Sequence, residues 1–240
     1  MMQVWVYWII GLTLVTYGSV QVIKRYPQYG FAALTGFYII YLGASQVLAT
    51  RIILFDLGFY KPFFAPAAVF IYPFIAQVID MINEVYGRKS TQVAILIAFA
   101  TQVLLILFIA MVNTLSPAPF FAFEDAWKSL FGLSIRITAA SWIAFIICSN
   151  LDALVFAGLK QKFLERENKF RYDISVNPYV WLRSSVSDAM DLTLDSVIFV
   201  TLAFFGVMPV IPLIIGQIIS KNVIGFIDNP WFVWYKRMLK

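Results

Sequence analysis

Long stretches without a charged residue dominate this chain. The windows Val4–Ile23, Gly30–Thr50 and Thr91–Thr114 contain no Asp, Glu, Lys or Arg. Because an α-helix rises about 1.5 Å per residue, a window of about 20 apolar residues is long enough to cross the hydrocarbon of a bilayer. Hydrophobic residues make up 61% of the 240 residues. The sequence therefore predicts an all-α, polytopic membrane helical bundle and shows none of the short alternating segments of a transmembrane barrel.

Turn-forming residues divide the chain into about seven transmembrane helices. The predicted spans are 4–23, 30–50, 63–84, 91–114, 133–159, 184–206 and 210–228. Proline or glycine lies between neighbouring spans, for example at Pro27, Pro62, Gly87 and Pro117, and Pro230 is expected to end the last helix. The segment Lys160–Asp173 is expected to be a charged loop. No polar stretch is long enough for a soluble domain, so residues 1–240 are predicted to form a single integral membrane domain.

Basic residues are distributed unevenly between the two sides of this predicted topology. Thirteen Lys and Arg residues fall on one side and four on the other. By the positive-inside rule the first side is cytoplasmic, which puts the N-terminus outside and the C-terminus inside. The expected location is the cell (inner, cytoplasmic) membrane. This bias also accounts for the basic net charge, so we expect no nucleic-acid partner.

The residue inventory excludes several kinds of chemistry. Cys148 is the only cysteine and the chain has no histidine, which removes disulfides, His-ligated metals and His-dependent catalytic triads. The sequence also lacks a Gly-rich phosphate loop and a Gly-x-Gly-Asp element. We therefore expect no enzymatic activity, no cofactor and no metal site.

Four of the predicted spans carry their polar residues in a helical stripe. Spacings of three, four and seven place each set on one helix face. A charged residue at the centre of a membrane helix costs roughly 2.5–3.5 kcal/mol in insertion experiments, so these side chains are expected to face each other, water or a ligand. This pattern predicts a polar cavity inside the bundle. The stripes are Gln77-Asp80-Glu84, Ser149-Asp152, Ser184-Asp188-Asp191-Asp195 and Gln217-Lys221-Asp228.

The predicted topology also gives each polar residue a depth. Asp195 and Lys221 fall near the bilayer midplane, Asp152 and Asp80 lie towards the inner side, and Asp191 lies between these levels. The stripes therefore meet in the inner half of the membrane, and aromatic side chains of the fifth helix lie above Asp152. The candidate substrate-binding residues are Asp195, Asp191, Lys221, Asp152, Asp80, Gln77, Asn150 and Trp142.

Each candidate has a structural alternative. Asp195 and Lys221 form a buried ion pair that only fixes helix packing. Asp80 and Glu84 mark a helix end that emerges among lipid headgroups near Arg88 and Lys89. Trp142 faces lipid or packs in the core. Asp188 and Asp228 are expected to be shallow, interfacial residues.

The same residues carry a resemblance to a known family. The stretch 63–89 and a second block, 182–206, resemble the queuosine precursor transporter family, also described as vitamin-uptake-transporter-like membrane proteins. The resemblance covers roughly residues 35–235. Its matching positions are Pro73, Asp80, Asn83, Glu84, Val85, Tyr86, Gly87, Arg88 and Lys89, then Asp152, then Arg183, Ser187, Asp191, Asp195, Ser196, Ile198, Phe199 and Gly206, and finally Lys221 and Pro230.

The resemblance implies a six-helix core, with an extra N-terminal helix here, and uptake of 7-deazaguanine tRNA-modification precursors in the cyano or aminomethyl form. A carboxylate can accept both N–H groups of a guanine-like edge. Our hypothesis is a secondary transporter in which Asp195 or Asp191 binds that edge and Lys221 tunes it. Asp80 and Glu84 are expected to form the inner gate or a proton relay.

The remaining groups of the base need partners of their own. Lys221, Gln77 or Asn150 would donate to the carbonyl oxygen of the base. Trp142, Phe145 or Tyr72 would stack on its flat face.

Two other functions fit the same pattern. One is the vitamin-binding membrane subunit of an ATP-driven energy-coupling transporter, which would need an ATPase module as partner. The other is a non-transporting structural membrane protein. The sequence leaves open which 7-deazapurine is used, whether protons drive transport or the substrate enters by facilitated diffusion, whether the chain forms a homodimer, and what the first helix does.

Overall fold

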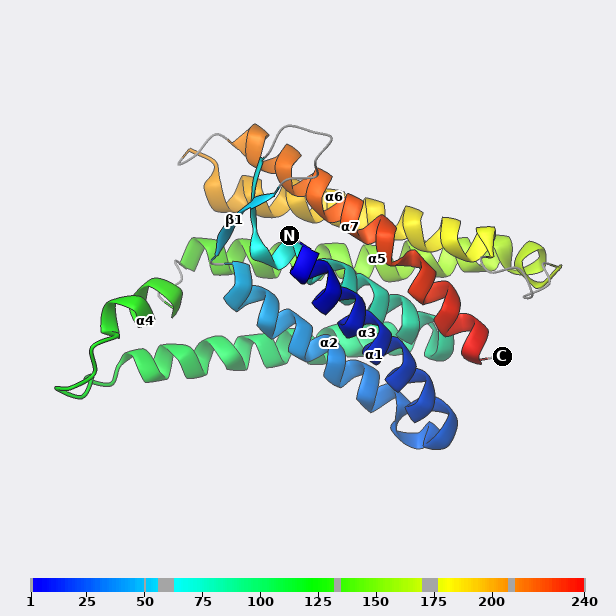
Figure 1. Ribbon diagram of the computed structural model, residues 1–240, viewed down its shortest axis with the longest axis horizontal. Helices are drawn as coiled ribbons and strands as arrows, with labels where there is room; N and C mark the ends of the chain where they lie inside the picture. Colours follow the sequence, from blue (N-terminus) through cyan, green and yellow to red (C-terminus); the bar gives the residue numbers. More distant parts are fainter. Residues whose placement is uncertain are drawn as a thin grey trace.

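Long helices account for nearly all of the fold (Figure 1). The computed structural model describes residues 2–49, 51–55, 63–131, 135–169, 177–206 and 210–239. Within these residues, five segments are long and apolar enough to cross a membrane, which confirms the predicted helical, polytopic membrane bundle. The α-helices are α1 (Met2–Arg25), α2 (Pro27–Ala49), α3 (Tyr72–Asn113), α4 (Glu124–Phe131), α5 (Ile135–Lys169), α6 (Pro178–Phe204) and α7 (Val210–Leu239).

Helix α3 is two helices joined at a sharp break. Gly87 has φ 78° and ψ 170°, a left-handed conformation that glycine adopts without the steric cost other residues meet. The break separates segments 72–86 and 88–113, and the second segment runs back towards α4 (Figure 1). This confirms the two spans predicted on either side of Gly87.

The start predicted for the third span is wrong. Residues 63–66 form strand β2 (Phe63–Pro66), which pairs antiparallel with β1 (Ile52–Phe55), and residues 67–70 form the 3₁₀-helix η1 (Ala67–Phe70). Two prolines explain the delay. Pro66 is extended (φ −60°, ψ 141°), and Pro73 is placed in the first turn of α3, where its missing N–H costs nothing.

Two helix ends extend beyond their predicted limits. Helix α5 continues to Lys169, so residues 160–169 of the predicted loop are helical, since Lys, Gln, Glu and Arg are good helix formers. Residues 170–173 lie outside the described residues. Helix α6 begins at Pro178 rather than at residue 184. The side chain of Asn177 caps it by accepting from the backbone N–H groups of Tyr179 (3.0 Å) and Val180 (3.4 Å).

Pro230 does not end the last helix, contrary to the prediction. Helix α7 passes through it to Leu239. A proline leaves the carbonyl four residues earlier, that of Phe226, without its usual donor. The Asn229 amide donates to the Phe226 carbonyl at 3.5 Å and to the Gly225 carbonyl at 3.0 Å. A neighbouring side chain thus compensates for the lost hydrogen bond, as membrane helices allow.

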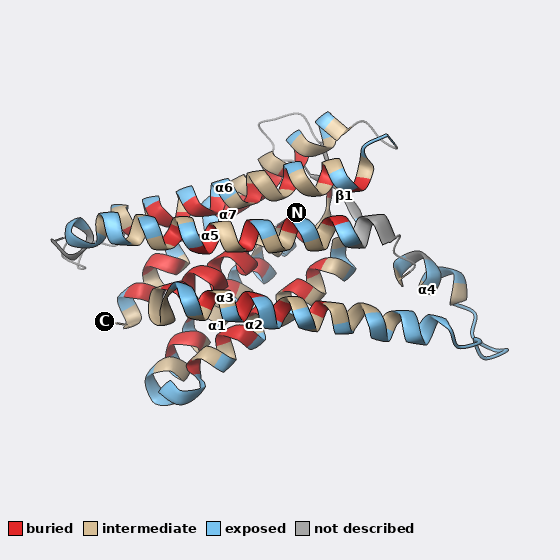
Figure 2. Cartoon of the chain, turned by 180° about the vertical axis from the view of Figure 1, so that it is seen from behind, coloured by how far each residue is buried: buried red, intermediate tan, exposed pale blue. Residues whose placement is uncertain are grey.

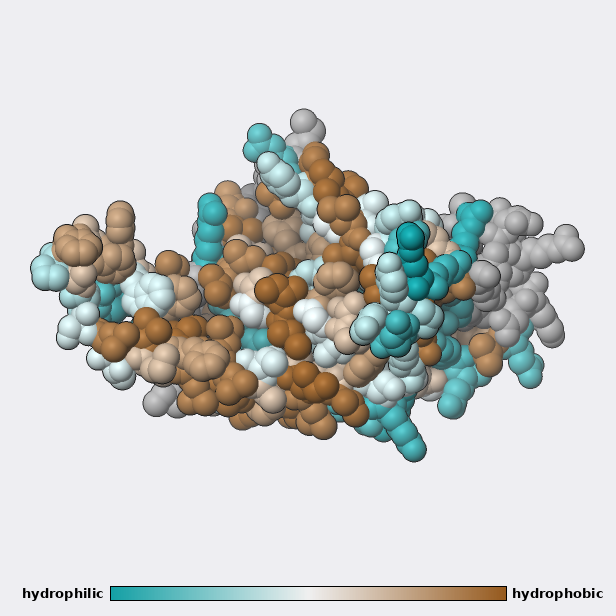
Figure 3. Space-filling model, turned by 90° about the horizontal axis from the view of Figure 1, so that it is seen from below, coloured by the Kyte–Doolittle hydropathy of each residue, from teal (hydrophilic) through white to brown (hydrophobic). Residues whose placement is uncertain are grey.

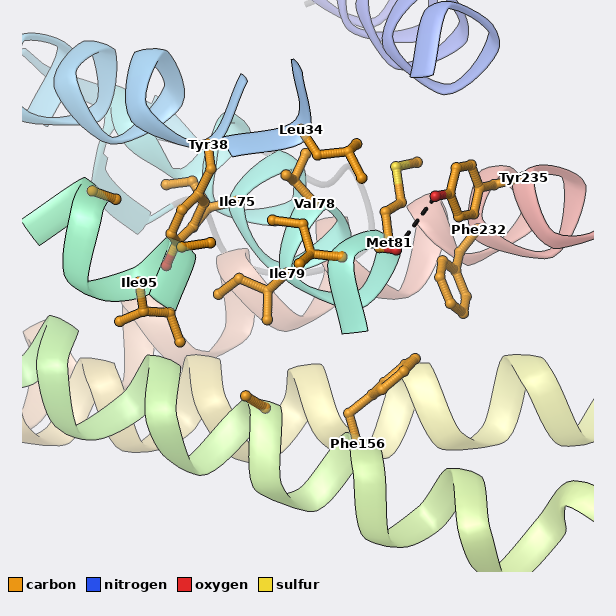
Figure 4. Close-up of a cluster of buried hydrophobic side chains, with 14 of the residues drawn as sticks. Leu34, Tyr38, Ile75, Val78, Ile79, Met81, Ile95, Phe156, Phe232 and Tyr235 are labelled. Carbon is orange, nitrogen blue, oxygen red and sulfur yellow. Dashed lines mark hydrogen bonds between the residues drawn. The ribbon is translucent and has the colours of Figure 1, made fainter. Parts of the chain in front are cut away.

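The first segment of α3 lies at the centre of the bundle. Figure 4 shows Ile75, Val78 and Ile79 among side chains from α2, α5 and α7, and the hydroxyl of Tyr235 donates to the carbonyl of Met81 at 3.3 Å. Buried residues gather on the inner faces of the helices and exposed ones on the outer faces (Figure 2). The central helix therefore places the stripe of Gln77, Asp80 and Glu84 inside the protein.

Helix α1 packs on the bundle through an aromatic cluster. Trp8 contacts Trp5, Phe74 and Trp231 edge to face, with ring centroids 5.6–6.0 Å apart. The Trp8 indole N–H donates to the carbonyl of Phe70 at 3.0 Å, and that of Trp231 donates to Thr13 at 3.0 Å. The first helix therefore covers η1 and α7, which gives it a packing role.

The two ends of the bundle differ in character. The α1–α2 turn, the start of α6 and the C-terminus lie at one end, and α4 and the strands lie at the other (Figure 1). Hydrophilic residues gather at the first of these ends, and apolar residues cover much of the rest of the face in Figure 3. This agrees with the predicted alternation of spans, while the assignment of that end to the cytoplasm stays a prediction.

Candidate functional site

A cavity of about 50 Å³ lies among α2, α3, α5 and α6. Its wall includes the carboxylates of Asp191 and Asp195 and the rings of Tyr72, Trp142 and Phe145. Water molecules fit such a space, whereas ligand pockets usually measure about 300–1,000 Å³. The cavity as it stands is therefore smaller than a usual ligand pocket. Its other lining residues are Leu42, Ser45, Gln46, Ile75, Gln102, Ser141, Cys148 and Ser149.

Lys221 of α7 forms an ion pair with Asp195 of α6, as their common predicted depth suggested. The ammonium also lies 3.6 Å from the ring centroid of Tyr72, a cation–π contact. Lys221 is 1% exposed, and the side chain of Asp195 is 15% exposed. One oxygen of Asp195 is thereby neutralised by a buried cation while the residue still lines the cavity.

Asp191 stands one helical turn from Asp195 and lacks a comparable partner. Its Oδ1 atom is buried and has no hydrogen-bond partner. Its charge interacts with Asp152 on one side and with Asp195 and Lys221 on the other. Since a carboxylate is acceptor-only when ionised, this oxygen is available to a ligand that brings N–H donors.

Three further aspartates form a carboxylate cluster outside the cavity lining. Asp80 of α3, Asp152 of α5 and Asp188 of α6 each place a carboxylate oxygen within 4.8 Å of the others, and all three are buried. Ser184 donates to Asp80 at 2.6 Å, and Ser187 donates to Asp152. Carboxylate oxygens are the ligands that hard cations prefer, and those of the carboxylate cluster are spaced closely enough to bind one.

Asp188 and Asp228 differ from the sequence expectation. They were expected to be shallow, yet Asp188 is 3% exposed and Asp228 is 2% exposed within the bundle. The signal was present for Asp188, because it continues the stripe of Asp191 and Asp195 at a spacing of three and then four. Depth along a single helix did not show that α3 and α5 cover this position.

Glu84 lies among three cations at the polar end of the bundle. Its carboxylate pairs with Arg183 (2.6 Å), Lys236 (2.9 Å) and Lys160 (3.3 Å). Lys160 also donates to the backbone carbonyl of Glu84 at 2.7 Å. The alternative that placed Glu84 among headgroups near Arg88 and Lys89 is wrong, because α5, α6 and α7 supply the partners and the side chain is 11% exposed.

Arg183 links this ion-pair network to the core. Its guanidinium lies 4.7 Å from the ring centroid of Phe156 and 5.7 Å from that of Phe232. The side chain is fully buried. A buried arginine with a carboxylate and two rings as partners ties α6 to α5 and α7 at this end of the protein.

Several predicted substrate residues do not line the cavity. Asp80 and Asp152 belong to the carboxylate cluster, and the Asn150 amide donates to the Ile146 carbonyl of its own helix at 2.8 Å. Gln77 is buried, with both amide atoms unpartnered, but is not part of the lining. Of the candidate substrate residues Asp191, Asp195 and Trp142 line it and Lys221 does not, while the other two predicted stacking residues, Tyr72 and Phe145, also line it.

Sequence reasoning missed Gln102 in the cavity wall, and it assigned Ser149 to a polar stripe without naming it as a candidate substrate residue. Ser149 appeared in a polar stripe, and Tyr38 donates to its hydroxyl at 3.2 Å. Gln102 stands alone in an apolar helix, so no stripe marked it. An isolated polar residue in an uncharged span is the signal that would have identified it.

Comparison with known proteins identifies the family of this chain. Residues 66–235 match the model of the family described as "Putative vitamin uptake transporter". This chain belongs to that family. It is therefore a member of a transporter family and a multi-pass membrane protein, and the resemblance found in the sequence is confirmed.

One curated relative carries a more specific name. The "Probable queuosine precursor transporter" of Bacillus subtilis (strain 168) is 26% identical over 163 residues, which cover 67% of this chain and 66% of the relative. No solved structure matches the chain.

Proposed function

We propose that this protein is a secondary transporter that imports 7-deazaguanine tRNA-modification precursors, in the cyano or aminomethyl form, across the cell membrane. The observation that carries the proposal is the buried, unpartnered Oδ1 atom of Asp191 in a cavity walled by Tyr72, Trp142 and Phe145. A flat base with adjacent N–H donors matches both features. The name of the Bacillus subtilis relative points to the same substrate class.

Asp191 is the carboxylate best placed to bind the guanine-like edge. Asp195 is already paired with Lys221, whereas Asp191 keeps a free acceptor. Two charge-assisted hydrogen bonds from the ring N–H and the exocyclic amine would satisfy it. Asp195 and Lys221 then set the charge balance of the cavity, and an aminomethyl group would meet the second carboxylate.

The ion-pair network of Glu84 is the proposed inner gate. It joins α3 to α5, α6 and α7 at the polar end of the bundle, so opening there requires breaking contacts with Arg183, Lys160 and Lys236. Alternating access around one site is the general mechanism of secondary transporters.

The carboxylate cluster is the proposed proton relay. Asp80, Asp152 and Asp188 lie too close together in a low-dielectric interior for all three to be ionised without nearby positive charge. Proton uptake supplies that charge. Asp188 lies one helical turn from Asp191 on α6, which connects the relay to the substrate site. Substrate accumulation should fall on addition of a protonophore, and unchanged accumulation would favour facilitated diffusion.

The test of substrate and site is complementation. Cells that can neither make nor import queuosine precursor would express this chain and receive the cyano or aminomethyl base at nanomolar concentration. Queuosine-modified tRNA is then followed by boronate gel shift. We expect modification with the native chain and at least about 10-fold less with Asp191→Asn, because that change disrupts charge-assisted hydrogen bonds.

A matched control separates the site from general loss of charge. Glu165 is exposed on α5, so Glu165→Gln removes a carboxylate away from the cavity and should transport normally. Normal uptake by Asp191→Asn, at equal membrane levels, would remove Asp191 from the site. Absence of modification with the native chain would contradict the substrate assignment.

A vitamin-binding subunit of an ATP-driven transporter is the second candidate, and the family description favours it. That function requires an ATPase module as partner. Purification of the chain from its native membrane with a bound ATPase, together with ATP-dependent vitamin uptake, would support it over the first proposal.

A further inference from the structure

Two cavity residues have buried polar atoms to which the proposed function gives no role. Gln102 of α3 is 4% exposed, and its Oε1 atom is buried with no hydrogen-bond partner. The indole Nε1 atom of Trp142 on α5 is also buried with no hydrogen-bond partner. Both residues line the cavity beside Asp191. Buried polar groups are almost always paired, so this wall is incomplete without a ligand or water.

The orientation of the Gln102 amide follows from chemistry. Its Nε2 atom lies 3.4 Å from the carbonyl oxygen of Ile39 on α2. A carbonyl oxygen can only accept, so the amide nitrogen must face α2, which settles the assignment that coordinates alone leave open. The atom left without a partner is therefore an acceptor.

Trp142 supplies a hydrogen-bond donor, whereas Gln102 supplies an acceptor. Its indole N–H is a donor only. The ring packs edge to face on Phe99, with centroids 5.8 Å apart and planes at 80°, and Phe99 in turn stacks on Phe145. These contacts hold the indole within an aromatic wall.

We propose that Gln102 and Trp142 are specificity-determining residues of the cavity: Gln102 accepts a ligand N–H, and Trp142 donates to a ring nitrogen or carbonyl oxygen. The inference rests on the proposed function and adds to it the arrangement of hydrogen-bond donors and acceptors by which the cavity recognises its ligand. With Asp191, the wall offers two acceptors and one donor. The ligand class is a planar heterocycle that presents three N–H donors, two adjacent ones for Asp191 and one for Gln102, and at least one acceptor for Trp142.

The test is a cycle that pairs protein variants with ligand analogues. Binding of 7-cyano-7-deazaguanine to the purified full chain is compared with binding of analogues that each lack one group: the exocyclic amine, the pyrrole N–H (by methylation), the carbonyl oxygen or the second ring nitrogen. Each analogue is measured with the native chain, Gln102→Met and Trp142→Phe. Gln102→Met keeps the approximate size and shape of the side chain while removing its acceptor. Trp142→Phe removes the donor together with part of the ring, a packing loss that parent and analogues share and that cancels in the cycle.

We expect Gln102→Met to weaken binding of the parent base about 10- to 100-fold, the usual effect of leaving a buried ligand donor unpaired. One analogue that lacks an N–H should bind the native chain and Gln102→Met about equally. In the same way, Trp142→Phe should weaken binding of the parent base more than binding of one analogue that lacks an acceptor. Gln161→Met, at an exposed position of α5, is the control and should change nothing.

The outcomes separate the two proposals. One outcome is that the native chain binds the parent base, but the effects of each substitution and each missing ligand group on the binding free energy simply add. Ordered water then satisfies these atoms, and the specificity assignment is overturned while the proposed function stands. If the native chain binds neither the parent nor any analogue, the proposed substrate class fails, and this inference fails with it. Elution of each variant as a single folded species in detergent ensures that a weak signal reports binding.

Discussion

Lys221 is a buried cation that pairs with one of two neighbouring carboxylates on α6. Its ammonium is 1% exposed and balanced by Asp195 and the face of Tyr72, in a part of the bundle where an unpaired charge has no water to stabilise it. Asp191, one turn away, keeps an oxygen free. The difference between a satisfied and an unsatisfied carboxylate on the same helix face is the reason for the proposal that Asp191 binds the substrate and Asp195 supports the site.

The ion pair makes a prediction at this scale. Lys221→Met should lower the free energy of unfolding by about 3–5 kcal/mol, because it leaves the Asp195 carboxylate buried and uncompensated. Adding Asp195→Leu should recover much of that loss. Thermal unfolding of the single and double variants in detergent measures both effects.

Function then separates the two interpretations of the pair. If the pair contributes to the substrate site, the stable double variant should show no uptake. A double variant that is stable and transports normally would instead make the pair purely structural.

At the scale of elements, α2 and α3 pack closely where Gly30 meets Tyr86. A Cβ atom added at Gly30 would lie 2.1 Å from the Tyr86 hydroxyl oxygen and 3.0 Å from the Ile23 side chain. Gly36, two turns along the same helix, has no atom within 4 Å of the corresponding position. The start of α2 is thus fitted to the residue just before the Gly87 break.

This contact predicts opposite effects for two identical substitutions. Gly30→Ala should destabilise the protein by about 1–3 kcal/mol, since the Tyr86 ring must move. Gly36→Ala should be neutral or raise stability by up to about 1 kcal/mol through helix propensity. Thermal unfolding of both variants is the measurement, and equal stability would show that Tyr86 yields without cost.

At the scale of the whole molecule, the cavity, the carboxylate cluster and the Glu84 network follow one another from the interior towards the polar end. Asp188 of the cluster lies one helical turn from Asp191, and Ser184, which donates to Asp80, adjoins Arg183, the partner of Glu84. Helices α3, α5 and α6 contribute to all three. A movement that opens the proposed gate would therefore displace the same helices that line the proposed substrate site.

The single cysteine reports on that movement. Cys148 is buried in the cavity wall, so it should react slowly with small thiol reagents in the native protein. Glu84→Gln should raise its reaction rate several-fold, because three cations lose their shared anion and the polar end opens more readily. Bound substrate should slow labelling. Arg88→Gln, an exposed charge at the same end, is the control, and Cys148→Ala gives the background.

Equal labelling of Glu84→Gln and the native chain would contradict the gate.

The sequence by itself determined the membrane-spanning helical architecture, the break at Gly87, the common level of Asp195 and Lys221, and the family. These features depend on local properties of the sequence: windows without charge, a glycine that can adopt positive φ, and the energetic cost of a charge inside the membrane. None of them depends on which helices pack together. Only the tertiary structure decided which polar residues share a space. It put Asp80 and Asp152 with Asp188, surrounded Glu84 with cations from three helices, and added Gln102 to the cavity. A helical stripe fixes which face is polar, but the contact between two faces depends on how the helices cross, and that is set by packing across the whole bundle.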